Sequence, residues 1–443
     1  HIPSVEKIQD CVEKHLMGAG RYEIAKAYIL YREKQNEKRE ELKEKLIKQF
    51  EKHSMKVIKA DGTQELFNLE KIQAVFDRAV AGYEKECRFE DLIEAFKKNI
   101  VDEIKTSDIN KLLVKTCIDL VTIENIVWQE VAGRIALFNL YKEACRNRNI
   151  THEAIYSPQA VLALFHDYIQ SGLYAKELRE AYTDEDILKA AESIDLTLDL
   201  SYGYTTILSL DKRYLLNPNK IVKELPQEMY LFVGLFLAIP ETKETRIATA
   251  IDMYRGCAEQ KISLATPSLM NARTTFHQLS SCFKLNVDDD LRAIYHAVEN
   301  IAQISKYGGG VGVYLGNIRS RGSSIRGIEG VSGGVNPWVK VINDTAVAVN
   351  QLGARLGAIS VTLDIWHRDI YDFLDLQTET GDIRSKAFDI FPAVSIPDLF
   401  MQRLEADADI TLFDPHEVTV LYGKSLQDTF NESFEEFYLA LEK

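Results

Sequence analysis

Two helical patterns open the chain. Apolar residues recur at spacings of three and four, first in Val5/Ile8/Val12/Leu16 and then in Ile24/Ala27/Tyr28/Tyr31. This spacing places each set on one face of an amphipathic helix. Gly18-Ala19-Gly20 lies between the two patterns and predicts the break between the helices.

A run of mixed charges follows. Residues 37–52 (EKREELKEKLIKQFEK) contain 11 charged side chains in 16 positions, six basic and five acidic. Opposite charges three to four positions apart stabilise a helix surrounded by water. The pattern therefore predicts a charged, solvated helical linker over residues 37–54.

After the linker, residues 55–146 have the pattern of a small separate domain. Two short runs of β type, MKVIK and QELFN, flank Asp61-Gly62, which predicts a hairpin. Helical patterns follow and end in Trp128–Cys145. A weak repeat with an offset of 107 residues relates Ile24-Ala25 and Leu30-Tyr31 to Val131-Ala132 and Leu137-Phe138. It indicates a duplicated module whose first copy, residues 1–36, is cut off at His1.

The remaining chain has two parts. Helical patterns dominate residues 147–260, where the apolar run Met229–Pro240 predicts a core helix. In residues 261–443, short apolar strands alternate with helices and glycine-rich loops. This alternation is typical of an α/β fold.

Composition and charge narrow the class of protein. Of the 443 residues 46% are hydrophobic and 27% charged, which excludes wholesale disorder. No apolar run approaches the roughly 20 residues of a membrane span, so we expect no membrane partner. The net charge of −14, without a separate basic block, argues against nucleic-acid binding. Small phosphorylated ligands remain possible, because a few local cations and amides suffice for them.

The cysteines and the first residue add two expectations. Six cysteines without a C-x-x-C pair argue against a disulfide scaffold and a zinc ribbon. We therefore predict no metal site and a reducing, cytoplasmic location, since no signal peptide pattern is present. The chain starts at His1 instead of Met, and we expect it to be a piece of a longer product.

The first candidate site follows the predicted hairpin. Lys59, Glu65, Asn68 and Lys71 lie on it or just after it, and Thr106 belongs to a hydroxyl-rich helix start. The two lysines and the helix N-terminus suit phosphate groups. Without further evidence, the residue pattern favours a hairpin with exposed lysines and a helix N-cap over a phosphate site.

Glycines, arginines and one cysteine mark the last part of the chain. Lys306–Gly316 (KYGGGVGVYLG) contains three consecutive glycines but matches neither the dinucleotide fingerprint nor the P-loop. Arginines follow in two glycine-rich stretches, which suits phosphate or base recognition as well as a solvated loop. Cys282, in Leu279–Phe283, is either an inert buried residue or a thiol that needs a partner from elsewhere.

Together these segments resemble the large (α) subunit of ribonucleotide reductase. Val57–Cys145 looks like that family's ATP-cone, which senses ATP against dATP. Further similar stretches follow in the family's order: Ala265–Met270 through Ser281-Cys282, Lys306–Gly327, Gly353–Ile365 and Asp409–His416. The resemblance implies an α/β fold with helical cone modules over residues 1–36 and 55–146, then a helical region. Residues 261–443 would form the first half of a ten-stranded α/β barrel whose second half is absent.

The resemblance also implies roles for individual residues. Cys282 would be one half of the dithiol that reduces the ribose, and Thr266, Ser281 and Gly310 would touch the substrate. The specificity effector would be held by Asp289, Asp290, Leu291, Arg319 and Arg326, with Gln351 and Arg355 on the specificity loop. The adenine nucleotide in the cone would contact Lys59, Glu65, Asn68, Lys71, Thr106 and Lys142. Asn110 stands where many members have a histidine.

The implied enzyme reduces ribonucleoside diphosphates by thiyl-radical chemistry. It would work as a homodimer with a radical-generating metal-containing small (β) subunit and with thioredoxin or glutaredoxin as reductant. ATP, dATP and other deoxynucleoside triphosphates would act as effectors, and this chain itself would bind no other cofactor. One alternative is the adenosylcobalamin-dependent class of the family. Another is a regulatory nucleotide-binding remnant without catalysis.

The cysteine count sets one further expectation. Reducing the ribose takes two thiols that close a disulfide, and the radical needs a third. No cysteine occurs after Cys282. We therefore expect the 443-residue polypeptide alone to show no turnover.

Overall fold

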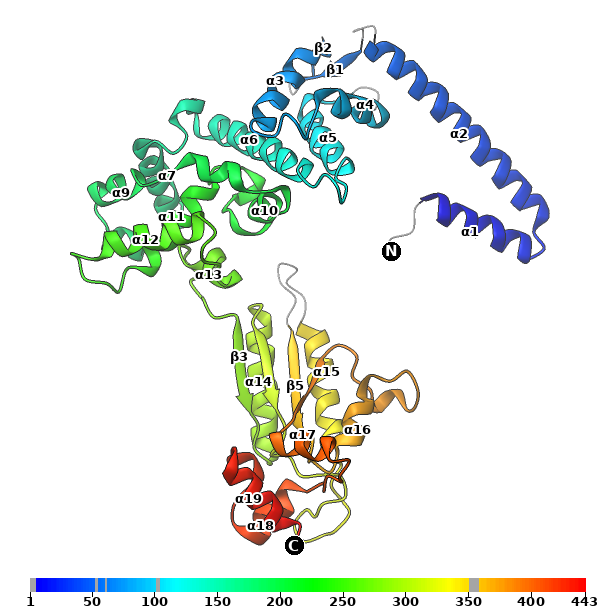
Figure 1. Cartoon of the computed structure of the whole chain (residues 1–443), viewed down its shortest axis with the longest axis vertical. Coiled ribbons are helices and arrows are strands. Elements are labelled where there is room, and N and C mark those ends of the chain that lie inside the picture. The colour runs from blue at the N-terminus through cyan, green and yellow to red at the C-terminus, as the bar shows by residue number, and fades with distance from the viewer. Residues whose placement is uncertain (1–4, 52–54, 60–61, 101–103, 350–357) are drawn as a thin grey trace. The chain divides into compact units, whose positions relative to one another are not determined.

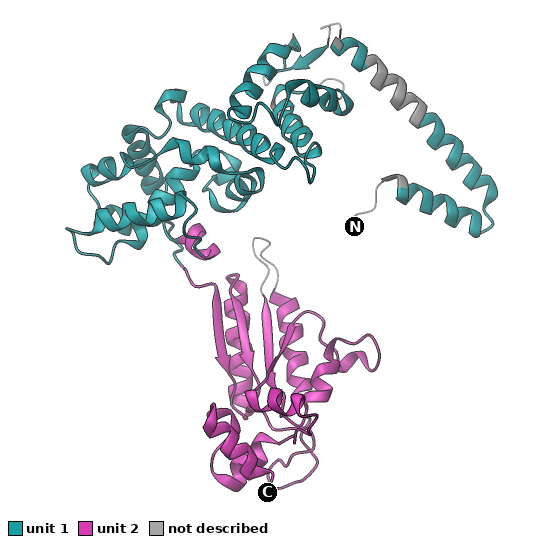
Figure 2. Cartoon of the chain, in the orientation of Figure 1, with its two compact units in different colours: residues 1–264, 272–277 teal, residues 265–271, 278–443 magenta. Residues whose placement is uncertain are grey.

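The structure is a computed structural model and describes residues 5–51, 55–59, 62–100, 104–349 and 358–443 (Figure 1). The chain divides into two compact units (Figure 2). Unit 1 comprises residues 1–264 and 272–277, and unit 2 comprises residues 265–271 and 278–443. Each unit has apolar cores of its own.

Unit 1, in its described residues, has helices and one hairpin as its regular elements. Its first elements are α1 (Val5–Gly18), α2 (Tyr22–Glu51), β1 (Lys56–Ile58), β2 (Gln64–Leu66), α3 (Leu69–Val80), α4 (Phe89–Asn99), α5 (Thr106–Asp119) and α6 (Trp128–Arg148). After these come η1 (His152–Ala154), α7 (Pro158–Gln170), α8 (Lys176–Ala181), α9 (Asp184–Ala191), η2 (Leu196–Ser201), α10 (Tyr204–Ser209), η3 (Leu210–Tyr214), η4 (Pro218–Lys220), α11 (Pro226–Leu237) and α12 (Arg246–Ala258).

The first two helices form where the sequence predicts them. α1 ends at Gly18, and Gly20 adopts a φ of 69°, the left-handed conformation that glycine adopts readily. α2 then continues without a break through residue 37 to Glu51. One face of its last turns is not solvated, because Leu46 and Phe50 are buried in the core of the cone segment, residues 55–146, whereas Lys48 between them is exposed. The prediction of a solvated linker is therefore wrong at its C-terminal end, where two apolar residues four positions apart find a partner surface.

The cone segment starts with the predicted hairpin. β1 and β2 pair antiparallel with Val57 opposite Glu65, and Gly62 in the turn has a φ of 83°. Asp61 lies outside the described residues. The buried face of the hairpin and the helices that follow it share one apolar core, which includes Val57, Phe67 and Trp128. Burial of this core holds the short hairpin in place, since an isolated two-stranded hairpin is marginal in water.

The second part of unit 1 packs around α11. This helix is buried along almost its whole length, so the predicted core helix is confirmed. Most of its buried residues are apolar, but Gln227 and Glu228 are polar and also have no exposed surface. Such groups need hydrogen-bond partners to be tolerated inside a protein.

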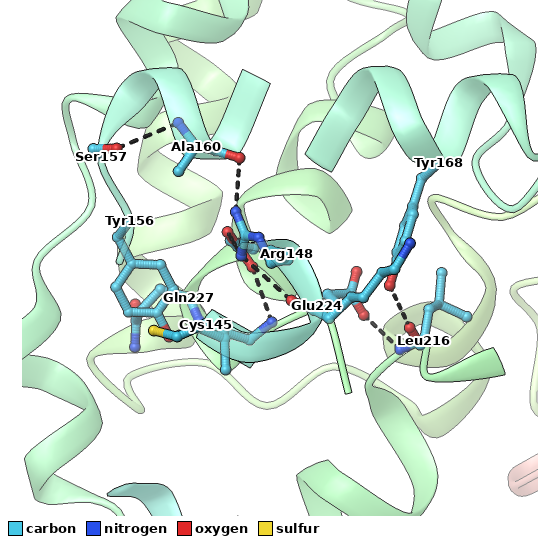
Figure 3. A network of polar contacts seen from close by, with 12 residues as sticks. Cys145, Arg148, Tyr156, Ser157, Ala160, Tyr168, Leu216, Glu224 and Gln227 are labelled. Carbon is cyan, nitrogen blue, oxygen red and sulfur yellow. Dashed lines mark hydrogen bonds and ion pairs between the residues drawn. The ribbon is translucent and has the colours of Figure 1, made fainter. Parts of the chain in front are cut away.

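A network of polar contacts supplies those partners (Figure 3). Arg148 donates to Glu228 Oε1 at 2.7 Å and to the carbonyl oxygen of Ala160 at 2.7 Å. Glu224 accepts from the backbone N–H of Leu216 at 2.6 Å and forms a fully buried ion pair with Arg273. The network ties α6, α7, α11 and the loops between them together.

Unit 2 is built on a parallel sheet. Its elements are α13 (Thr266–Asn271), β3 (Cys282–Asn286), α14 (Leu291–Lys306), β4 (Gly310–Tyr314), α15 (Asn336–Val349), β5 (Ile359–Asp364), α16 (Ile370–Leu374), η5 (Asp375–Gln377), η6 (Ile383–Ser385), β6 (Phe391–Ser395), α17 (Asp398–Glu405), α18 (Pro415–Tyr422), η7 (Leu426–Asp428) and α19 (Glu432–Leu441). The four strands pair in the order β3-β4-β5-β6, all parallel. The predicted α/β alternation is confirmed for the described residues.

The two faces of this sheet differ. Val311, Val313, Val361 and Leu363 alternate onto one face and join the core formed with α14 and α15. The residues between them, and Cys282 at the start of β3, point to the other face, because side chains alternate along a strand. Cys282, the candidate reducing thiol, therefore lies on the face away from this core.

Two features are absent from the residues that the structure describes. None of the described helices combines the length and apolar character needed to cross a membrane. No group of three or more His, Cys, Asp or Glu side chains in the described part of the chain is placed to hold a metal ion.

Candidate nucleotide and thiol sites

The cone segment encloses a cavity of about 530 Å³. Its walls come from the hairpin, from α3, α5 and α6, and from His152 in η1. All six side chains expected to contact the adenine nucleotide line this one cavity: Lys59, Glu65, Asn68, Lys71, Thr106 and Lys142. The fold thus brings together residues that are scattered over the sequence of the cone segment.

Charge at this cavity is concentrated around Glu65. Its Oε2 lies 2.9 Å from Lys59 Nζ and its Oε1 lies 3.5 Å from Lys71 Nζ. The hydrogen bond from Lys59, together with the positive charge of both lysines, lowers the pKa of Glu65 below its usual value. The side chain of Lys71 is 69% exposed, so its ammonium group can turn toward an incoming phosphate.

The inner walls of the cavity are apolar. Phe67 and Ile72 are buried there, and the guanidinium carbon of Arg78 lies 4.7 Å from the centre of the Phe138 ring. Apolar walls with a few polar groups at the mouth are the usual construction of a small-molecule site. The arrangement can hold a planar ring inside and phosphate groups near the lysines.

Two asparagines of the cavity have defined partners. Asn68 caps α3, and its side-chain oxygen accepts from the backbone N–H of Lys71 at 3.2 Å. Asn110 donates to Asn139 Oδ1 at 3.2 Å, and Asn139 donates to Glu143 Oε1 at 3.1 Å. The Asn110 amide is therefore held by a side chain of α6.

Cys282 is exposed at the first position of β3. Ser281 Oγ lies 3.5 Å from its sulfur and can donate to it. In the parallel sheet Cys282 pairs with Gly310, and the Gly310 N–H donates to the carbonyl oxygen of Ser281 at 2.8 Å. Three residues expected at the substrate, Ser281, Cys282 and Gly310, thus lie side by side.

The three consecutive glycines before β4 meet different requirements. Gly308 has a φ of 74°, and a Cβ on Gly309 would come within 2.5 Å of Ile304 Cγ2. A Cβ on Gly310 would meet nothing closer than 3.5 Å, which is ordinary contact. Backbone conformation and packing therefore explain the first two glycines but not Gly310, whose missing side chain leaves space beside the thiol.

Thr266, the fourth residue expected at the substrate, begins α13. α13 is tied to the segment before Cys282, because Ser268 Oγ donates to the carbonyl oxygen of Leu279 at 3.4 Å. Asn271 Nδ2 donates to that of Gln278 at 2.9 Å. These contacts anchor the helix that carries Thr266, and a common role of Thr266 and Cys282 stays a prediction.

Two of the residues expected to hold the specificity effector form an ion pair. Arg319 Nε donates to Asp289 Oδ2 at 2.7 Å, and the Arg319 backbone N–H donates to Asp289 Oδ1 at 3.1 Å. Asp290 caps α14 by accepting from the N–H groups of its first turn, and Leu291 is exposed. Arg326 is exposed and has a φ of 54°.

Not all expected residues can be placed. Gln351 and Arg355 lie outside the described residues. No hydrogen bond or ion pair among the described residues brings Arg326 to the Asp289–Arg319 pair. The site formed by Asp289 and Arg319 is therefore smaller than the set the resemblance implies.

Comparison with known proteins places these sites in a family. A model described as the ribonucleotide reductase barrel domain matches residues 280–443, and one described as the all-alpha domain of the same enzyme matches residues 200–277. The ATP cone model matches residues 1–37 and 55–143. The chain belongs to the ribonucleotide reductase large-subunit family.

Curated relatives agree with this membership. The α subunit of ribonucleoside-diphosphate reductase from Treponema pallidum is 35% identical over 441 residues, which are 98% of this chain and 49% of that protein. The α subunit from Synechocystis is 38% identical over 390 residues, 88% of this chain and 49% of the relative. Large chain 2 from Saccharomyces cerevisiae is 33% identical over 404 residues, 88% of this chain and 43% of the relative. The chain spans about half the length of the curated relatives it matches.

Sequence reasoning missed several residues of this reductase-family chain. Arg78 and Phe138 line the cone cavity, but neither stands in a recognisable motif. Asp414, in a stretch noted only for its resemblance, accepts from the Ser320 N–H at 3.1 Å and from the Ser323 hydroxyl. It therefore fixes the loop that carries Arg319. The position of Asp414 just before Pro415 indicates a helix N-cap. It does not indicate the contact with the serines about 90 positions earlier.

Proposed function

We propose that this chain serves as the large subunit of a ribonucleoside-diphosphate reductase. It would reduce nucleoside diphosphates to deoxynucleoside diphosphates in the reducing cytoplasm. The observation that supports this most directly is the exposed thiol of Cys282 beside Gly310, on the sheet face opposite the apolar core. An exposed thiol next to open space can reach a bound ribose.

Cys282 supplies one of the two electrons and one of the two thiols. When the ribose 2′-carbon loses its hydroxyl as water and gains hydrogen, two thiols become a disulfide, which balances the two-electron reduction. The described part of unit 2 contains no second cysteine. The second thiol and the radical-bearing thiol would therefore come from outside the described part of unit 2.

The initiating radical and the reductant come from partners. We propose a separate radical-generating small subunit, because the curated relatives are named as α subunits. Thioredoxin or glutaredoxin would reopen the disulfide, and the large subunit would act as a homodimer with the effector held near Asp289 and Arg319. An enzyme that worked with adenosylcobalamin in place of the small subunit would contradict this assignment.

The cone cavity would regulate the enzyme by binding ATP or dATP. The lysines around Glu65 would hold the phosphates, and the apolar walls near Phe67 would hold the base. The cone would bind the nucleotide without breaking or forming a covalent bond. Regulation would follow if the bound nucleotide changed how the cone packs.

The cone proposal is tested by calorimetric titration of the full chain with ATP and with dATP. Lys71→Gln removes a charge-assisted contact of about 1.5–3 kcal/mol and is expected to weaken binding at the cone about tenfold or more. Lys98→Gln, an exposed lysine of α4 away from the cavity, is the matched control. Unchanged affinity in Lys71→Gln would reject the cone as the regulatory site.

The thiol proposal is tested by alkylation. A nucleoside diphosphate such as CDP is expected to slow the reaction of Cys282 with N-ethylmaleimide, whereas exposed Cys11 in the same molecule is expected to react at an unchanged rate. In the enzyme assembled with its small subunit and thioredoxin, Cys282→Ser is expected to abolish thioredoxin-dependent turnover. Full turnover in that variant would exclude Cys282 from the dithiol.

A further inference from the structure

A second cavity in unit 1 is larger than the nucleotide cavity of the cone. It has a volume of about 880 Å³ and is formed by α5 and α6 of the cone segment together with α10, η3 and the loop that follows, up to Val222. Ligand sites in proteins usually have volumes of about 300–1,000 Å³. Nothing in the proposed reductase function uses this space.

The lining has an apolar floor and a basic rim. Val114, Leu140, Ile207, Leu215 and Val222 are buried among the residues that line it. Four lysines join them, Lys111, Lys115, Lys212 and Lys220, against two acidic residues, Glu143 and Asp211. In a chain whose net charge is −14, a cavity with an excess of positive charge is selective for anions.

The side chains of three of these lysines form no ion pair in the part of the chain that the structure describes. Lys111 pairs with Asp108 at 3.0 Å, but within the described residues the ammonium groups of Lys115, Lys212 and Lys220 form no ion pair or hydrogen bond. The charge of Lys212 acts on Asp211 without a direct contact. All three are exposed, so their ammonium groups keep the freedom to turn over the cavity mouth. Unpaired lysines around an apolar floor are the arrangement that phosphate groups attached to an organic body would bind.

The two acidic residues do not cancel this charge fully. Burial, followed by the nearby charge of Glu143, raises the pKa of Asp211 above its usual value. The charge of Lys212 opposes this shift, and with four lysines against two acidic residues the lining keeps an excess of positive charge. The charged groups that face this pair from the packed elements are Lys212 on η3 and the lysines of α5.

The second cavity touches the first one. Asn110 and Asn139 line both cavities, and the hydrogen bond between them forms part of the wall that separates the two spaces. Glu143, which accepts from Asn139 at 3.1 Å, lines only the second. A ligand in the second cavity therefore lies close to the nucleotide cavity without sharing its lysines.

We propose that this cavity is a second anion site, which binds an organic polyphosphate of nucleotide size between the cone segment and the α10–η3 region. The lysines at positions 115, 212 and 220 hold the phosphates, and the buried aliphatic residues contact the organic part. The inference goes beyond the reductase function and does not depend on nucleotide binding in the cone.

Site-resolved lysine labelling of the full chain tests the proposal. The protein is treated with a limiting amine-reactive reagent, alone or with inorganic tripolyphosphate or ATP, and each lysine is read by mass spectrometry. At a ligand concentration of about ten times Kd the site is about 90% occupied, so labelling of Lys115, Lys212 and Lys220 is expected to fall up to about tenfold. Protection by ATP at lower concentration than by tripolyphosphate supports the binding of an organic polyphosphate, and equal protection by the two would show that the aliphatic residues do not contact the ligand.

Variants separate the two cavities. Lys59→Gln/Lys71→Gln disables the cone cavity and is expected to leave the protection at the second cavity intact. Lys115→Gln/Lys212→Gln is expected to remove the protection of Lys220, and the Lys→Arg pair at the same positions is expected to retain it. Because these side chains are exposed, neither pair is expected to disturb folding.

Three outcomes would overturn the inference. They are unchanged labelling of Lys115, Lys212 and Lys220 with both ligands, protection that is lost in the cone variant, and equal protection of the distant control Lys98. Protection of Lys59 and Lys71 is read in the same experiment, so a failure of the cone proposal is distinguished from a failure of this one.

Discussion

Cys282 and Gly310 are direct neighbours on the first two strands of the parallel sheet. Parallel strands in register place such neighbours on the same face, so the residue opposite the thiol is the one with no side chain. The sheet itself does not need a glycine there, because a Cβ would make only ordinary contacts, at 3.5 Å from the Ser281 oxygen and 3.7 Å from the Ala358 oxygen. Packing within the sheet therefore does not explain why glycine stands beside the thiol.

This relationship predicts opposite effects for two adjacent alanine substitutions. Gly310→Ala is expected to leave the stability of unit 2 within about 0.5 kcal/mol and to weaken the protection of Cys282 by CDP. Gly309→Ala is expected to destabilise unit 2 by about 1–3 kcal/mol through overpacking against Ile304 and Phe283. Denaturant unfolding and thiol labelling measure the two effects. A stable Gly310→Ala variant with unchanged CDP protection would remove the glycine from the substrate site.

The Asp289–Arg319 pair predicts a local loss of stability. Both side chains are about four-fifths buried, at 21% and 20% exposure, and Asp289 also accepts from the Arg319 backbone. Asp289→Asn removes the charge from these hydrogen bonds and is expected to cost about 1–2 kcal/mol and to weaken binding of a deoxynucleoside triphosphate effector. Asp288→Asn, at the exposed neighbouring position, is the control. Equal behaviour of the two variants would show that the pair contributes nothing beyond surface charge.

A buried carboxyl group in unit 1 predicts a dependence of stability on pH. Asp199 has no exposed surface, and it accepts hydrogen bonds from Tyr141, from Tyr156 at 2.6 Å and from Gln227 at 2.7 Å. Burial raises the pKa of Asp199 to about 6, and these hydrogen bonds only partly oppose the shift. Around pH 5 the folded protein therefore holds a proton that the unfolded chain has already released, since an ordinary aspartate titrates near pH ~4.

The sign of the effect follows from proton linkage. Between about pH 4 and 6 the folded state binds more protons than the unfolded state, so the free energy of unfolding falls as pH rises through this window, by about 2–3 kcal/mol for this group. Asp199→Asn is expected to flatten that decline, whereas exposed Asp252→Asn is expected to preserve it. Glu228, whose pKa is raised from 4.5 to about 7 chiefly by burial, adds a decline that overlaps this window and extends to about pH 7, and both variants keep it. Urea unfolding across the range from acid to neutral pH measures all three.

Local patterns predicted the elements of the fold well. The spacing of apolar residues located α1 and α11, and Asp61-Gly62 located the hairpin, because each depends on residues within one turn or one strand pair. The charged run misled at its end, where Leu46 and Phe50 form a short apolar stripe that the surrounding charges obscure. Only the partner surface of the cone decides that these two residues are buried.

Long-range polar contacts could not be read from the sequence. The cone residues were found through resemblance, since nothing in the spacing of Lys59 and Lys142 indicates a common cavity. Glu224 and Arg273 are 49 positions apart and belong to no motif. Their pairing depends on how α11 and the segment after α13 pack, which is a property of the whole of unit 1.

That ion pair supports the last prediction. Glu224 and Arg273 have no exposed surface, and Glu224 also accepts from Tyr174 at 2.8 Å. Removing one partner of a buried pair leaves an uncompensated charge, so Arg273→Met is expected to cost about 3–5 kcal/mol. Adding Glu224→Gln to Arg273→Met removes the stranded charge, while the amide oxygen still accepts from Tyr174, and is expected to recover much of that loss. Denaturant unfolding of the wild-type chain, the two single variants and the double variant measures the coupling. If the double variant is as unstable as the sum of the single variants predicts, the two charges do not depend on each other, and the rigidity of this part of unit 1 comes from its apolar core alone.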